Sequence, residues 1–218
     1  MARTKSSASW LSRHLSDPFV KKAQKDGYRS RSAYKLIELN EKDKLIRPGM
    51  RIMDLGSAPG GWSQVAGKLV GEKGRVLATD ILPMDGLRNV DFIQGDFTDE
   101  AVVQRIFDWL AGQKFDLIVS DIAPNISGIE SADQGRSIYF LELALDTVCK
   151  TLKPGATFTA KMFQGSGSDE YLKELRKHFS KVSIRKPEAS RKESREVYLV
   201  AKGFKGCAAA SGPADGGR

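Results

Sequence analysis

From residue 50 onward, short apolar runs alternate with longer segments whose apolar residues recur at helical spacing. The apolar runs predict strands at 51–56, 74–80, 90–96, 115–121 and 156–165, with closing strands at 181–187 and 196–204. The helically spaced segments predict helices at 62–70, 99–110, 135–152 and 169–179, and the Lys-Pro-Gly at 153–155 ends the third of these. This alternation predicts an α/β fold, with a mostly parallel seven-stranded sheet and helices on both of its faces.

Two regions depart from this alternation. The short polar connection at 188–195 joins the last two strands, so one of them should run antiparallel. Residues 1–50 are basic, contain a predicted helix at 30–46, and should pack on the edge or mouth of the sheet. We therefore expect an N-terminal helical segment at 1–50, a sheet domain at 51–205 and a disordered tail at 206–218.

Composition narrows the class of protein. The chain has 218 residues, of which 40% are hydrophobic and 28% charged, as in an ordinary soluble domain. It has neither an apolar run long enough to span a membrane nor the apolar core of a signal peptide. The two cysteines, Cys149 and Cys207, and the two histidines, His14 and His178, show no metal-ligand spacing. We expect no disulfide framework and no metal site, and a cytoplasmic location.

The net charge of +8 is unevenly distributed. Residues 1–35 carry +7, residues 36–172 carry −6, residues 173–205 carry +7, and the tail is neutral. A single charged cluster is most often solvated surface. Two clusters of one sign at opposite ends of the chain favour a single positive face for a polyanion, if the fold brings them together.

The expected carboxyl ends of the first four strands carry distinctive residues. The first strand runs into "DLGSAPGGWSQ", where Gly60 and its neighbours permit a tight turn and Trp62 adds an aromatic ring. The next three strands end in Asp80, Asp96 and Asp121. Ligands of open α/β sheets bind beyond these strand ends.

Each of these carboxylates alone could equally cap a helix or form a turn. Together, Asp80 could bind ribose hydroxyls and Asp96 the amine of an adenine. Because the glycine turn holds no basic residue, the set fits a nucleoside cofactor without phosphate, such as S-adenosylmethionine.

Four blocks, "DLGSAPGGWSQ", "SDIAPNISG", "AKMFQG" and "SREVYLVAKGF", together with "GYRSRSAYKL" near the start, resemble the FtsJ/RrmJ family of methyltransferases, and most closely its RlmE branch. The similarity covers about residues 7–204. It implies a Rossmann-like methyltransferase fold that binds S-adenosylmethionine. Its catalytic set falls on Lys35, Asp121, Lys161 and Glu196. Its cofactor contacts fall on Gly60, Trp62, Asp80, Asp96 and Asp121.

The resemblance also implies the substrate. It is a uridine ribose in the A-loop of 23S rRNA, methylated at the 2′-oxygen within the large (50S) ribosomal subunit. Separately from the resemblance, we expect a monomer with no membrane contact. The basic ends favour an RNA substrate independently, because phosphate contacts supply much of the affinity for nucleic acid.

Lys161 interrupts an apolar strand, and two roles for it remain open. A neutral Lys161 would accept the proton of the 2′-hydroxyl, the role we favour; a charged Lys161 would orient the hydroxyl while water or Asp121 takes the proton. Taken singly, Lys35 could be a solvated or phosphate-binding lysine. Glu196 could simply pair with Arg195 or Lys192.

Three rival functions share parts of this pattern. A related enzyme could methylate a transfer RNA or an mRNA cap with the same catalytic set. A small-molecule methyltransferase would not need the two basic ends. A catalytically silent RNA-binding or ribosome-assembly factor would not need the four-residue set.

Overall fold

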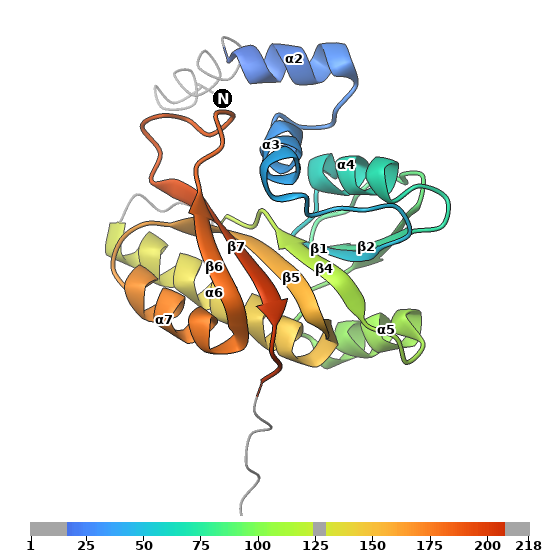
Figure 1. Cartoon of the computed structure of the whole chain (residues 1–218). Helices are drawn as coiled ribbons and strands as arrows, with labels where there is room; N and C mark the ends of the chain where they lie inside the picture. Colours follow the sequence, from blue (N-terminus) through green and yellow to red (C-terminus); the bar gives the residue numbers. More distant parts are fainter. Residues whose placement is uncertain (1–16, 124–129, 208–218) are drawn as a thin grey trace, which may run out of the picture.

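The computed structural model describes residues 17–123 and 130–207 (Figure 1). The helices and strands follow in the order α2 (Pro18–Asp26), α3 (Ala33–Asp43), β1 (Arg51–Leu55), α4 (Gly61–Val70), β2 (Arg75–Asp80), β3 (Val90–Gln94), α5 (Glu100–Leu110), β4 (Phe115–Ser120), α6 (Glu130–Thr151), β5 (Leu152–Phe163), α7 (Ser168–His178), β6 (Phe179–Arg185) and β7 (Glu196–Phe204). Each predicted strand and helix is present, with shifted ends. As predicted, the Lys-Pro-Gly tripeptide at Lys153–Gly155 follows the end of α6. It lies inside β5, however, and not in a turn between the helix and the strand.

The strands form one seven-stranded sheet in the order β3-β2-β1-β4-β5-β7-β6. All neighbours pair in parallel except β7, which is antiparallel to both β5 and β6. This confirms the prediction of one antiparallel strand, since the short loop after β6 can only return the chain alongside it. The order reverses between β1 and β4, so the carboxyl ends of these two strands diverge into a crevice.

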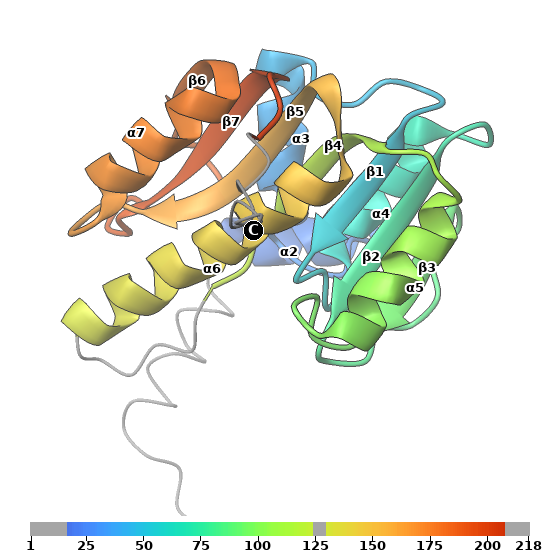
Figure 2. The same cartoon turned by 90° about the horizontal axis from the view of Figure 1, so that it is seen from below.

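Helices cover both sides of the sheet (Figure 2), and their apolar residues pack against it. One core packs α5, α6 and α7 against the sheet and includes Ile106, Leu141 and Leu175. The other core packs α3 and α4 against the opposite face and includes Leu36 and Val65. The N-terminal segment thus shares a core with the sheet.

Helix α2 is a feature that the hydrophobic pattern does not predict. Its ends are defined by local chemistry: the Asp17 carboxylate accepts a hydrogen bond of 3.0 Å from the Phe19 amide, Pro18 occupies the first turn, and Gly27 ends the helix at a φ of 73°. Because only Val20 and Ala23 are buried in this helix, its apolar stripe is too narrow to detect in the sequence.

The structure contradicts the expectation that the two cysteines are unpaired. Cys149 near the end of α6 and Cys207 just after β7 form a disulfide, with their Cα atoms 5.5 Å apart. The two residues are 58 positions apart in the sequence, and only the antiparallel course of β7 brings the chain end back to α6. Among the described residues, no helix combines the length and apolar character needed to cross a bilayer.

Candidate active site

A cavity of about 440 Å³ lies beyond the carboxyl ends of the central strands. It collects residues from four loops, including all three carboxylates singled out in the sequence. The lining residues are Gly56, Ala58, Asp80, Ile81, Leu82, Gly95, Asp96, Phe97, Asp121, Ile122, Ala123 and Phe140. Polar groups therefore converge on a partly apolar hollow, as is typical of a ligand site.

Two of the carboxylates also organise the loops that carry them. Asp80 accepts hydrogen bonds from the amide of Ala58 at 2.9 Å and from that of Leu82 at 2.8 Å. Asp96 accepts hydrogen bonds from the amide and the hydroxyl of Thr98 through a single oxygen. Asp80 thereby joins the glycine turn to the loop after β2, while Asp96 keeps its second oxygen for other partners.

The glycine turn approaches its surroundings closely. Gly56 has a φ of 69°, and a Cβ atom there would lie 2.1 Å from the Cγ1 of Ile122. Any larger residue would therefore displace the wall of the cavity. Gly60, with a φ of 105°, is likewise crowded by Met84 and Arg29.

Two predicted cofactor contacts, Gly60 and Trp62, do not line this cavity. The Trp62 side chain is buried, its indole N–H donates to the carbonyl of Ser32 at 2.8 Å, and its ring lies 5.6 Å from that of Tyr198. In this structure, Trp62 connects the glycine turn to the N-terminal segment. Its contact with a cofactor remains a prediction, as does that of Gly60.

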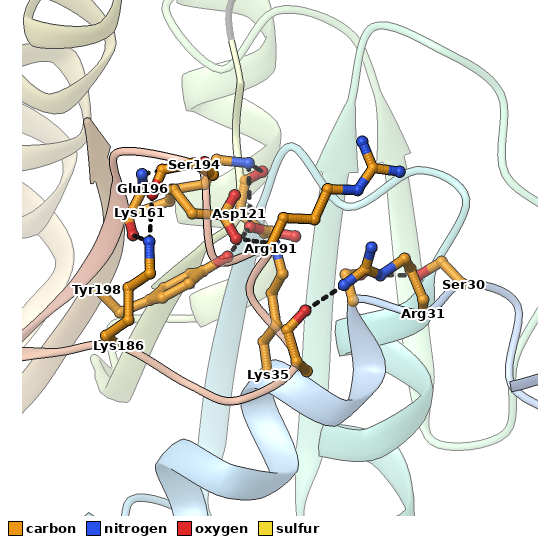
Figure 3. Close-up of polar contacts among 12 residues, drawn as sticks. Ser30, Arg31, Lys35, Asp121, Lys161, Lys186, Arg191, Ser194, Glu196 and Tyr198 are labelled. Carbon is orange, nitrogen blue, oxygen red and sulfur yellow. Dashed lines mark hydrogen bonds and ion pairs between the residues drawn. The ribbon is translucent and has the colours of Figure 1, made fainter. Parts of the chain in front are cut away.

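The four predicted catalytic residues form two ion pairs beside the cavity (Figure 3). The ammonium nitrogen of Lys161 lies 3.1 Å from the Asp121 carboxylate and donates to the Asp121 carbonyl at 2.7 Å. The ammonium nitrogen of Lys35 lies 2.7 Å from the Glu196 carboxylate. The structure therefore pairs Lys35 with Glu196, although α3 and β7 lie near opposite ends of the sequence.

Tyr198 belongs to the same cluster, and sequence reasoning did not single it out. Its hydroxyl donates to Asp121 Oδ1 at 2.6 Å, and the Lys35 nitrogen lies 5.5 Å from the centre of its ring. Its position two residues after Glu196 on a strand was the available signal, because alternate residues of a strand face the same side.

Electrostatics keep both acids of the cluster ionised. Burial would raise the pKa of Asp121, but the nearby Lys161 and Lys35 cations and the Tyr198 hydrogen bond outweigh it and lower the pKa. Burial would also raise the pKa of Glu196, and the Lys35 cation lowers it instead. The two carboxylates in turn hold the side chains of Lys161 and Lys35 beside the cavity.

Asp54, in the glycine-turn motif, was also missed and behaves in the opposite way. Its carboxyl is buried, with one oxygen accepting from the Ser63 hydroxyl at 2.6 Å and the other without a partner in the described part of the chain. Burial raises the pKa of Asp54 to about 7, with smaller contributions from the nearby Asp121 and Asp80.

Comparison with known proteins agrees with this geometry. A family model described as "FtsJ-like methyltransferase" matches residues 28–204. The chain belongs to the FtsJ-like methyltransferase family. The match begins just after α2 and spans α3, the glycine turn, the cavity and the two ion pairs, so all the site residues named above lie within the FtsJ-like region.

Two similar FtsJ-like proteins are named "Ribosomal RNA large subunit methyltransferase E". The protein from Stutzerimonas stutzeri is 72% identical over 206 residues, covering 94% of this chain and 100% of its own length. That from Marinobacter nauticus is 62% identical, covering 94% of this chain and 99% of its own. A crystal structure of a ribosomal RNA methyltransferase from Plasmodium falciparum matches with a TM-score of 0.75 and 32% identity, covering 83% of this chain and 100% of the other.

Proposed function

We propose that this protein transfers the methyl group of S-adenosylmethionine to the 2′-oxygen of a uridine ribose in the A-loop of 23S rRNA, within the large ribosomal subunit. The observation that carries the proposal is the meeting of Lys161, Asp121, Lys35 and Glu196 beside a cavity ringed by carboxylates. Family membership supplies methyl transfer, and the names of the similar proteins supply the large-subunit RNA.

The cavity fits the proposed cofactor in chemistry. Asp80 would accept hydrogen bonds from ribose hydroxyls, Asp96 from the adenine amine, and Asp121 would face the positively charged end. Close approach of a ligand suits the turn at Gly56, where a side chain would obstruct the wall. Gly60 and Trp62, the other two predicted cofactor contacts, would contribute to cofactor binding through the shape of the glycine turn. When bound, the cofactor supplies a methyl group already activated by its sulfonium charge.

The protein's own task is to align the ribose and remove one proton. We propose that Lys161 accepts the proton of the 2′-hydroxyl as the oxygen forms its bond to the methyl carbon and the carbon–sulfur bond breaks. The ammonium group so formed would be stabilised by the Asp121 carboxylate and carbonyl, which already lie within 3.1 Å and 2.7 Å. Lys35 and Glu196 would border the ribose on its other side.

Replacing Lys161 tests this assignment. We expect Lys161→Ala to nearly abolish methyl transfer to large subunits, while the affinity for S-adenosylmethionine, measured by calorimetry, stays within a few-fold. Lys153→Ala is the matched control, because Lys153 is an exposed lysine on the same strand, beside Asp116. Substantial turnover by Lys161→Ala would refute the proton-acceptor role.

A substitution that keeps the positive charge separates the two roles of Lys161. An arginine stays charged and cannot accept a proton, but it can still donate hydrogen bonds to a hydroxyl. Lys161→Arg should therefore lose methyl transfer if Lys161 accepts the proton. Substantial single-turnover rates for this variant would favour the orienting role.

The substrate is tested by offering the protein transfer RNA, naked ribosomal RNA and intact large subunits side by side. Mapping of 2′-O-methyl sites should find one modified uridine, in large subunits. Modification of transfer RNA alone would indicate a methyltransferase that acts on transfer RNA. If no RNA were methylated, the protein would instead be a catalytically silent assembly factor.

The remaining parts of the proposal concern the rest of the chain. Within the N-terminal segment predicted at 1–50, residues 17–50 would face the RNA while packing on the sheet domain at 51–205. Residues 1–16 and all but the first two residues of the predicted disordered tail at 206–218 lie outside the described residues. We expect a monomer that acts in the cytoplasm, where ribosomal subunits are available. Light scattering of the purified protein checks the monomer.

A further inference from the structure

A second group of reactive side chains lies far from the active site. Cys149, His178 and Cys207 bring one sulfur or ring nitrogen each to within 4.8 Å of one another. They come from the end of α6, the end of α7 and the chain just after β7, whose opposite end carries Glu196. Figure 1 shows β7 leading away to this end of the sheet.

We propose that, when its disulfide is reduced, this group binds a soft divalent cation of the Zn²⁺ type. Two thiolates and an imidazole are the ligands that Zn²⁺ favours, with water free to fill the fourth position. In a tetrahedral zinc site the two sulfurs stand about 3.8 Å apart, given Zn–S bonds of about 2.3 Å. The bonded sulfurs must therefore separate after reduction. The Cα atoms of Cys149 and Cys207, 5.5 Å apart, and the nearby His178 ring leave the three groups within reach of one ion.

The surroundings of His178 support a ligand role. One ring nitrogen, Nε2, lies 3.2 Å from the carboxylate of Glu174, one turn earlier on α7. The other, Nδ1, lies 3.3 Å from the carbonyl of Gly206, which directly precedes Cys207. The Glu174 carboxylate can hold Nε2 and fix the ring, while Nδ1 would exchange its contact with the Gly206 carbonyl for the cation.

The disulfide and the metal exclude each other because both need the two sulfurs. A dithiol reductant would donate two electrons and two protons to the disulfide and itself become oxidised, leaving two thiols. Binding of the cation would then release both thiol protons as the sulfurs become thiolates. All three residues are partly exposed, so reductant and ion can reach them. Since a reducing compartment keeps thiols free, the metal form is the one expected there.

Cobalt titration of the full-length, reduced protein under anaerobic conditions tests the proposal. We expect one equivalent of Co²⁺ to bind with a thiolate-to-cobalt charge-transfer band, and Zn²⁺ to displace it. Cys149→Ser and Cys207→Ser should lose the band while methyl transfer is unchanged, since the site lies away from the catalytic residues. Glu174→Gln should weaken Co²⁺ binding about 10- to 100-fold. Glu170→Gln, an exposed acid on the same helix, should bind as the unchanged protein does.

A second measurement does not depend on the cysteine variants folding. Bound Zn²⁺ should slow re-formation of the disulfide by an oxidised dithiol at least tenfold. The proposal is overturned if the reduced protein shows no charge-transfer band, if the band persists in the cysteine variants, or if Zn²⁺ leaves the oxidation rate unchanged. None of these outcomes depends on the proposed methyl transfer.

Discussion

The two lysines of the active site are each paired with a carboxylate, and the two pairs meet at Tyr198. Tyr198 donates to Asp121, the partner of Lys161, and lies under the nitrogen of Lys35. A buried charge without a partner would be strongly unfavourable, and these pairs explain how Lys161 can lie in an otherwise apolar strand. We therefore expect substitutions of neighbouring residues to affect the site through their contacts with Asp121.

Tyr198→Phe removes a hydrogen bond to an ionised group while keeping the buried ring. Such bonds are worth about 1.5–3 kcal/mol, so we expect the single-turnover rate to fall about tenfold or more. Loss of the bond also raises the pKa of Asp121, which should shift the acid limb of the rate profile to higher pH. Tyr139→Phe, at an exposed tyrosine, is the control. Identical profiles for Tyr198→Phe and the unchanged protein would contradict this role.

The raised pKa of Asp54 leads to a prediction about the stability of the folded protein rather than about the rate of methyl transfer. In the folded protein its carboxyl keeps a proton up to a pH of about 7, whereas in the unfolded chain it ionises near pH 4. Between these values folding takes up a proton, so the free energy of unfolding falls as pH rises and levels off above about 7. Thermal unfolding without cofactor should show the unchanged protein losing stability relative to Asp54→Asn between about pH 4 and about pH 7. Parallel curves would rule out the raised pKa.

At the residue scale, the sequence was informative where chemistry is local. The strand-end carboxylates Asp80, Asp96 and Asp121 could be placed because a strand's end is visible in the hydrophobic pattern. The resemblance placed Lys35 and Glu196 in one catalytic set, but their ion pair was not predicted, because α3 and β7 meet through tertiary packing. The disulfide of Cys149 could not be predicted for the same reason.

At the scale of elements, the N-terminal segment and the loop between β6 and β7 form one unit. The Glu38 carboxylate on α3 accepts from the amides of Glu188 at 2.6 Å and Ala189 at 3.1 Å, and Arg31 donates to the carbonyl of Ala189. Arg185 adds two contacts of 2.8 Å to Asp43 at the end of α3. This loop leads directly into Glu196, so α3 positions both members of the Lys35–Glu196 pair.

Glu38→Ala should loosen the loop without touching the cavity. The amide of the buried Ala189 would lose its acceptor, at about 1–3 kcal/mol if it is left unsatisfied, while the amide of the exposed Glu188 can bind water instead. We expect the rate with large subunits to fall about tenfold, while the affinity for S-adenosylmethionine changes less than about twofold. Glu41→Ala, one turn further on the exposed side of α3, should behave as the unchanged protein. Equal losses in cofactor affinity and rate would instead indicate general unfolding.

Most helices and strands were predictable from the sequence. The exceptions have physical reasons. Strand β5 begins at Leu152 although Lys-Pro-Gly follows, because pairing of Phe115 with Leu152 in the sheet overrides the turn tendency of the tripeptide. Helix α2 was missed because caps, not a wide apolar face, define it. The order of the strands in the sheet could be read only from the structure, because a hydrophobic pattern does not show which strands pair.

At the scale of the whole molecule, the fold brings the described part of the first basic end, residues 17–35, beside part of the second. α2 and α3 lie on the same side of the molecule as the loop between β6 and β7 (Figure 1), and α3 contacts that loop. Several of the basic residues there form internal ion pairs, such as Arg31 with Asp17 and Arg185 with Asp43. Exposed lysines of α2, including Lys21 and Lys25, remain at the surface for contact with phosphates.

Salt dependence distinguishes such phosphate contacts from general charge. Each phosphate contact on single-stranded RNA contributes about −0.7 to the slope of the logarithm of affinity against that of salt concentration. The variant with both Lys21→Gln and Lys25→Gln should therefore bind large subunits more weakly at low salt, with a slope shallower by about 1.4 if each lysine makes one contact. The rate at saturating subunits should not change, because α2 carries none of the four catalytic residues. The control variant with Lys150→Gln and Lys173→Gln alters α6 and α7, on the other face of the sheet, and should keep the original slope. If both variants lose the same affinity and slope, attraction follows net charge alone, and the shared basic face does not direct the RNA to the active site.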